Sequence, residues 1–124
     1  MNQRFASISL KFALVILFVP TLLWSDQITQ PKTFTGEITD SICASSGSHA
    51  TAIARTPGMG NDSESCTTKC AAMGAKYVLL DQATHSVYTL DDQAQLAQFA
   101  GHKVRVTGTL NGNAIKVIKV SELG

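Results

Sequence analysis

Residues 103–120 have the sequence KVRVTGTLNGNAIKVIKV, in which two alternating runs are joined by Asn111-Gly112. In the first run, apolar or small residues at 104, 106, 108 and 110 alternate with polar residues, which is the period of a half-buried β-strand. Asn-Gly is the strongest short-range signal for a two-residue hairpin turn, because both turn positions need a positive φ. This stretch therefore predicts a hairpin of two strands.

The second run, from Ala114 to Val120, changes parity part-way along. Ile115 and Val117 share one face, whereas Ile118 and Val120 have the opposite parity. A β-bulge adds one residue to one strand and so resets the alternation. We expect a bulge near Val117 that lets both pairs of side chains face inward.

Three further strands are predicted upstream of this hairpin. Residues 34–40 alternate between apolar or small and polar side chains, and the glycine at Gly36 is typical of a bulge or bend within a strand. Residues 76–81 and 86–91 are short apolar segments around a polar turn, which predicts another hairpin.

A short helix is predicted between the third and fourth strands, over residues 92–100, where Leu96 and Phe99 have helical spacing. Five strands with a helix in this place follow the order of the OB-fold, a small partly open barrel. Barrel closure also reduces the edges that such short strands would expose. We predict a mainly β chain, folded as a five-stranded OB-like barrel with a cysteine-containing helical insertion after the first strand. Its predicted core contains Phe34, Leu79, Val104, Val106, Ile115 and Val117.

The insertion, residues 41–74, is rich in Ser, Ala, Gly and Thr, has no strand alternation and contains all three cysteines. Its second half predicts a helix over 62–73 with Asn61 as the N-cap. A shorter helical turn is expected to begin at Ser48 and to end before Pro57.

The length of 124 residues predicts one small domain. Residues 1–25 contain two basic side chains and an apolar run that is too short to span a membrane, a pattern typical of a cleaved signal peptide; an uncleaved N-terminal anchor is the alternative. Residues 26–33 are interpreted as a flexible tether and residues 34–124 as the OB-like domain. We therefore expect export to the periplasm or the extracellular space, with no stable membrane span after signal removal.

The charge of the chain argues against a nucleic-acid partner. Arg4 and Lys11 are two of the ten basic residues, so residues 26–124 hold 8 basic and 9 acidic side chains, a net charge near −1. A polyanion partner needs a concentrated positive surface. The expected partners are an unknown small ligand or an envelope protein, and His85 and His102 are expected to be exposed polar residues.

The cysteines and one histidine form the pattern Cys43-x5-His49-x16-Cys66-x3-Cys70. On the predicted helix, Cys66 and Cys70 lie one turn apart on one face. Three thiolates and one imidazole are the ligands of a structural Cys3His site, for which zinc or copper is the fitting ion. Met59 and Met73 would be soft additional ligands in such a site.

A disulfide is the simpler interpretation, because exported proteins meet an oxidising environment. A bridge from Cys43 to Cys66 or Cys70 would stabilise the domain by about 3–4 kcal/mol and leave one odd thiol. Through a disulfide bond or a shared metal ion, Cys43 is predicted to be linked to the helix that carries the other two cysteines. A third alternative is a thiol-redox-active or nucleophilic cysteine, although the chain has no Cys-x-x-Cys pair.

Four stretches resemble a family of small secreted bacterial proteins that have an OB-like barrel and no assigned activity. They are FTGEITDSIC at 34–43, GSH at 47–49, Cys66-x3-Cys70, and GHKVRVTG at 101–108. The resemblance covers nearly all of the predicted domain and implies architecture and export. The sequence as a whole leaves three functions open: an exported OB-like binding domain without catalytic machinery, an envelope metal-binding protein, or a thiol-redox protein.

Overall fold

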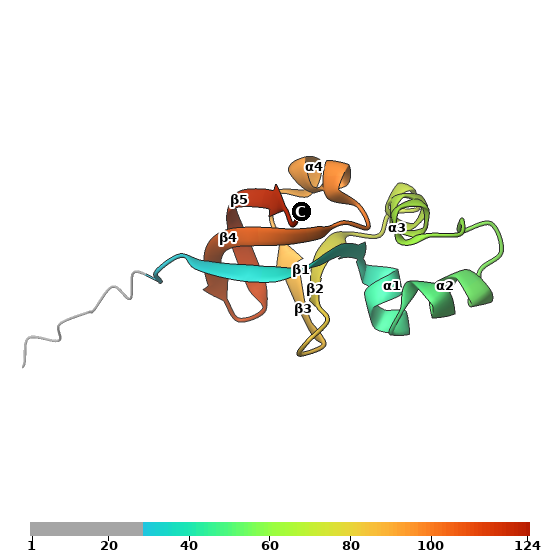
Figure 1. The fold of residues 1–124 in the computed structure, drawn as a ribbon, viewed down its shortest axis with the longest axis horizontal. Coiled ribbons are helices and arrows are strands. Elements are labelled where there is room, and N and C mark those ends of the chain that lie inside the picture. The colour runs from blue at the N-terminus through green and yellow to red at the C-terminus, as the bar shows by residue number, and fades with distance from the viewer. Residues whose placement is uncertain (1–28) are drawn as a thin grey trace, which may run out of the picture.

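The computed structural model describes residues 29–124 (Figure 1). The predicted signal peptide, residues 1–25, and the first part of the predicted tether lie outside the described residues. Within the described part of the chain, no helix has the length and apolar character needed to cross a membrane.

Five strands and several short helices make up the described chain. The strands are β1 (Lys32–Asp40), β2 (Tyr77–Asp81), β3 (Ser86–Leu90), β4 (Lys103–Asn111) and β5 (Ala114–Glu122). The helices are α1 (Ser41–Ser46), α2 (His49–Arg55), α3 (Ser63–Ala72), α4 (Gln93–Leu96) and the 3-10 turn η1 (Ala97–Phe99). The first strand starts two residues before the expected boundary, since Lys32 and Thr33 already pair with β4.

The five strands form a ring in the order β1-β2-β3-β5-β4. β1 pairs antiparallel with both β2 and β4, and β4 and β5 form the predicted hairpin. Its two turn residues are Gly112 and Asn113 instead of the predicted Asn111-Gly112, because Asn111 is paired with Ala114 and only Gly112 of the predicted pair has a positive φ. The ring is completed by a short parallel contact between β3 and β5, through Thr89 with Ala114 and Leu90 with Ile115. The prediction of a mainly β chain with five strands is confirmed.

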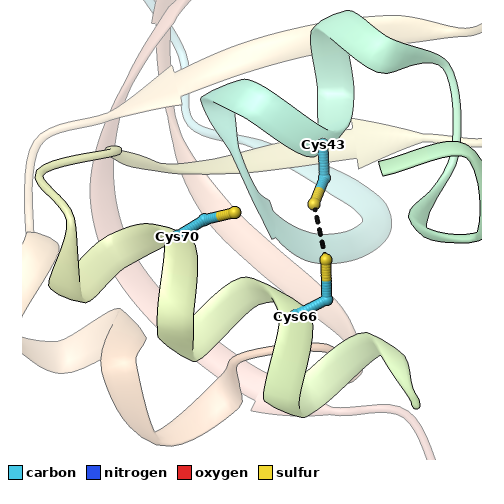
Figure 2. A group of neighbouring side chains, drawn as sticks. All are labelled: Cys43, Cys66 and Cys70. Carbon is cyan, nitrogen blue, oxygen red and sulfur yellow. Dashed lines mark hydrogen bonds between the residues drawn. The ribbon is translucent and has the colours of Figure 1, made fainter. Parts of the chain in front are cut away.

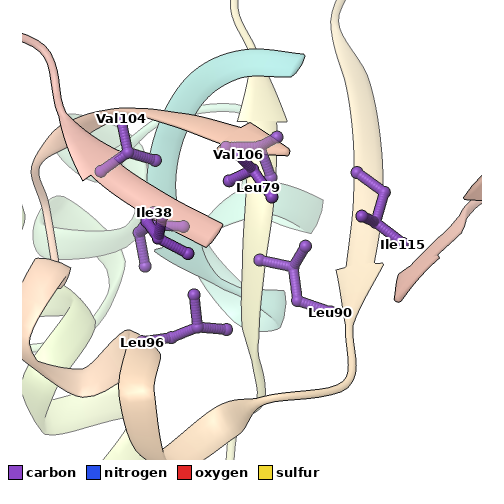
Figure 3. Close-up of a cluster of buried hydrophobic side chains, with 8 residues drawn as sticks. Ile38, Leu79, Leu90, Leu96, Val104, Val106 and Ile115 are labelled. Carbon is purple, nitrogen blue, oxygen red and sulfur yellow. The ribbon is translucent and has the colours of Figure 1, made fainter. Parts of the chain in front are cut away.

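The main core lies inside the ring (Figure 3). It is formed by Ile38, Leu79, Leu90, Leu96, Val104, Val106, Ile115 and Val120. Four of the six predicted core residues belong to it, and the other two, Phe34 and Val117, are partly buried and pack against it. Leu96, from α4, adds a helical side chain to this otherwise strand-built cluster.

The irregularity in β5 is present near Val117, but one of its predicted consequences is wrong. Successive residues of β4 pair with Lys119 and then Val117, so the register skips Ile118. Ile118 is 60% exposed instead of facing inward. The extra residue of a bulge is left out of the ladder, and Val120 thereby returns to the interior.

The helices α1, α2 and α3 form a layer at one end of the ring (Figure 1). Asp40, the last residue of β1, caps α1, which the sequence did not predict. The helical turn expected from Ser48 is α2, with Ser48 as its cap. The cap of α3 is Asp62 instead of the predicted Asn61, because the backbone N–H of Ser65 donates to Asp62 Oδ1 over 2.8 Å.

Candidate metal centre

Three cysteine side chains meet between the helices α1 and α3. Cys43 lies on α1, while Cys66 and Cys70 lie one turn apart on α3 and point toward it (Figure 2). The three sulfur atoms lie within 4.8 Å of one another. All three residues are buried, with exposed fractions of 2%, 0% and 0%. We call Cys43, Cys66 and Cys70 the cysteine trio.

The trio consists of thiols. The closest pair of sulfur atoms, Cys43 Sγ and Cys66 Sγ, is 3.1 Å apart, whereas a disulfide bond is about 2.05 Å long. No disulfide joins the three residues. Close packing of three side chains is what the structure shows, and the link predicted between Cys43 and the helix of the other two cysteines, by a disulfide or through a metal, stays a prediction.

Burial keeps two of these thiols protonated at neutral pH. Burial raises the pKa of the Cys43 thiol far above its usual value, and the neighbouring carboxylate of Asp40 and the thiol of Cys66 raise it further. Burial also raises the pKa of Cys70 to about 11, again with a contribution from the negative charge of Asp40. Since the thiolate is the nucleophile and the metal ligand, a proton must leave before either thiol reacts.

Asp40 belongs to this site in a role that the sequence did not predict. Its side chain has no exposed surface, and its Oδ1 accepts hydrogen bonds of 2.9 Å from the backbone N–H groups of Ile42 and Cys43. Among the residues that the structure describes, nothing donates a hydrogen bond to its buried Oδ2. The same aspartate therefore fixes the start of the helix that carries Cys43 and places a negative charge beside the trio.

His49, the predicted fourth ligand, is not brought into the trio. Its Nε2 lies 2.6 Å from Glu37 Oε1 and 3.4 Å from Thr39 Oγ1, over a neighbouring stretch of β1. Glu37 is itself held in place, since Gln82 Nε2 donates to Glu37 Oε2 over 2.8 Å. The buried Nδ1 of His49 makes no hydrogen bond within residues 29–124.

A small cavity of about 260 Å³ lies beside the His49–Glu37 pair and reaches Cys43 of the trio. His49 and Cys43 both line this cavity, whereas Cys66 and Cys70 do not. The other lining residues are Glu37, Thr39, Gly47, Ser48, Leu80, Gln82 and His85.

The two methionines that the sequence offered as extra ligands have different positions. Met59 is buried and packs in one cluster with the trio and Ala52. Met73 is 63% exposed and lies outside this cluster. Helix α3 buries Cys66, Thr67 and Cys70 on one face, and Met73, which directly follows the helix, does not share that burial.

Comparison with family models, with curated proteins and with solved structures finds no match for this chain.

Proposed function

We propose that this protein is an exported OB-like domain that binds one thiophilic metal ion through Cys43, Cys66 and Cys70. The observation that carries the proposal is the approach of three buried sulfur atoms from two helices to within 4.8 Å of one another. Thiolates select zinc and copper(I) among the common biological metals. Binding would replace the protons of the thiols by one ion.

The surroundings of the trio favour a cation. Asp40 is fully buried and has no ion pair among residues 29–124. A buried charge is costly unless a partner of opposite sign compensates it. A metal ion beside Asp40 would attract its carboxylate, and it would also link α1 to α3 in a layer whose helices are short.

The barrel part of the proposal rests on topology. The ring order of the strands and the placement of α4 and η1 between β3 and β4 support an OB-like architecture. The proposed export rests on the N-terminal sequence pattern, and membership of the secreted family stays a prediction. We propose a binding function instead of a catalytic one because a nucleophilic cysteine needs an adjacent base, and His49 is paired with Glu37 outside the trio.

Metal analysis together with a thiol count tests this function. The chain is purified without oxygen, supplied with zinc and passed through a desalting column. We expect one zinc ion per chain, with the three thiols protected from a thiol reagent until a chelator is added. Cys66→Ser should lose the ion, whereas Met73→Leu, a change at an exposed position next to the same helix, should retain it. A wild-type chain that retains no zinc would contradict the proposal.

The contact between Cys43 and Cys66 favours a second candidate, a redox-active pair. Their sulfur atoms are 3.1 Å apart, so a small movement would allow a disulfide bond. Each thiol would lose one proton and one electron to an external disulfide, which would be reduced to two thiols. One free thiol, no metal and a disulfide between residues 43 and 66 in protein isolated under air would favour this candidate.

A further inference from the structure

One of the two carboxylate oxygen atoms of Asp40 is buried and accepts no hydrogen bond among residues 29–124. Oδ1 caps α1 through the backbone N–H groups of Ile42 and Cys43, each 2.9 Å away. Oδ2 is buried, has no hydrogen-bond partner within residues 29–124, and belongs to a side chain with no exposed surface. Nearly all buried polar atoms in proteins have a partner, so this atom needs an explanation.

Helix capping alone does not explain it. An N-cap needs one oxygen, and serine, threonine or asparagine would provide that oxygen without burying a charge. The carboxylate lies next to two members of the trio, since it acts on the thiols of both Cys43 and Cys70. Its Oδ1 accepts from the backbone N–H of Cys43 over 2.9 Å, so the second oxygen of the same carboxylate is close to the member of the trio on α1.

We propose that Asp40 Oδ2 is the fourth ligand of the metal ion held by Cys43, Cys66 and Cys70. This inference rests on the proposed metal-binding function and makes the centre a Cys3Asp site. Zinc prefers four tetrahedral ligands and accepts carboxylate oxygen, whereas copper(I) is selected by soft sulfur ligands. The site is therefore a zinc site in preference to a copper(I) site.

Two other side chains compete for the fourth position. His49 has an Nδ1 without a hydrogen-bond partner among residues 29–124, but its ring is held by Glu37 over a neighbouring stretch of β1. Neither this ring nor the Asp40 carboxylate belongs to the group of ligand atoms that lie within 4.8 Å of one another. Met59 packs in the trio's cluster and would give an all-sulfur site suited to copper(I). Asp40 differs from both in offering a buried anionic oxygen that has no hydrogen-bond partner among residues 29–124.

The test compares three variants in the complete chain, prepared without oxygen. Asp40→Asn keeps an N-cap residue and removes the anionic oxygen. His49→Gln and Met59→Leu alter the competing side chains. Zinc affinity is measured by competition with a chromophoric chelator, and the geometry of the site is followed by the visible absorption of bound Co²⁺.

We expect Asp40→Asn to weaken zinc binding by at least tenfold and to shift the d–d bands of bound Co²⁺. We expect His49→Gln and Met59→Leu to change the affinity by less than threefold and to leave the Co²⁺ bands in place. The melting temperature gives a second readout. Without metal, Asp40→Asn should melt no lower than the wild type, because the substitution removes a buried charge; with zinc, its melting temperature should rise less than that of the wild type.

The outcomes separate this inference from the proposed function. If the wild type binds zinc and Asp40→Asn binds it equally well with unchanged Co²⁺ bands, Asp40 is a helix cap only and this inference is overturned. Loss of zinc in His49→Gln or Met59→Leu, with Asp40→Asn unaffected, overturns it in favour of the other residue. A wild-type chain that binds no zinc overturns both proposals. If Asp40→Asn does not fold, Asp40→Ser, which also caps helices, replaces it in every measurement.

Discussion

Replacement of Val106 by alanine tests the closure of the strand ring. Val106 has no exposed surface and lies in the middle of β4, where it is paired with Phe34 on β1 and with Val120 on β5. The substitution removes two methyl groups at about 0.8 kcal/mol each, and the cavity left behind adds a further cost, so we expect a loss of about 2–3 kcal/mol. Since a domain of this size has a free energy of unfolding of about 5–15 kcal/mol, the loss is large.

Urea denaturation followed by far-ultraviolet circular dichroism measures this loss. The midpoint should fall while the dependence on urea stays the same, and the melting temperature should fall by about 10–20 °C. Arg105→Ala is the matched control, because the neighbouring side chain is exposed and its loss should cost less than about 0.5 kcal/mol. Equal effects of the two substitutions would refute the inward orientation of Val106 and the pairing of β4 with two strands.

Two further predictions concern close approaches in the fold. In Gly36→Ala, the new Cβ would lie 2.4 Å from the carbonyl oxygen of Leu80, so β1 and β2 must separate. Denaturation should show a larger loss of stability for this variant than for Gly47→Ala, in which only a positive φ is strained. Equal denaturation midpoints of the two variants would contradict this prediction. His102 Nδ1 lies 2.6 Å from Glu122 Oε1, and this hydrogen bond raises the pKa of His102. The pKa of His102 is higher in the folded chain than in the unfolded chain, where it is about 6.5. The His102–Glu122 pair therefore stabilises the fold fully below pH about 6.5, and this stabilisation is lost as the pH rises through the pKa of His102 in the folded chain. Glu122→Gln should therefore lower the pKa of His102 in an NMR titration and lower the melting temperature in mildly acidic solution only; a pKa that does not move would contradict the assignment.

The strands could be predicted because their signals are local. The alternation along residues 103–110 and the Asn-Gly signal predict the β4–β5 hairpin without information from the rest of the chain, although the turn lies one residue later, at Gly112 and Asn113. The helix α3 was also predictable, although two adjacent residues, Asn61 and Asp62, are both good caps and only the structure shows which one is used. The exposure of Ile118 was not predictable, because the parity change does not reveal which residue the bulge expels.

The candidate site depends on contacts that no local pattern contains. Helical spacing predicts a shared face for Cys66 and Cys70, but the approach of Cys43 requires α1, a helix of six residues that was not predicted. Asp40 had no signal for burial, since aspartate is seldom fully buried. His49 has metal-ligand chemistry and a suitable position in the sequence, yet the structure pairs it with Glu37. Sequence spacing therefore predicted a group of cysteines that the structure brings together, and it included a histidine that the structure places outside that group.

X-ray absorption at the zinc edge is the most direct measurement of the metal centre. The wild-type chain, loaded with zinc and freed of excess metal, should show three sulfur neighbours at about 2.3 Å and one oxygen neighbour at about 2.0–2.2 Å. Three sulfur neighbours would be the signature of Cys43, Cys66 and Cys70 binding one ion together. A spectrum with only nitrogen and oxygen neighbours, or with fewer than three sulfur neighbours, would contradict the account.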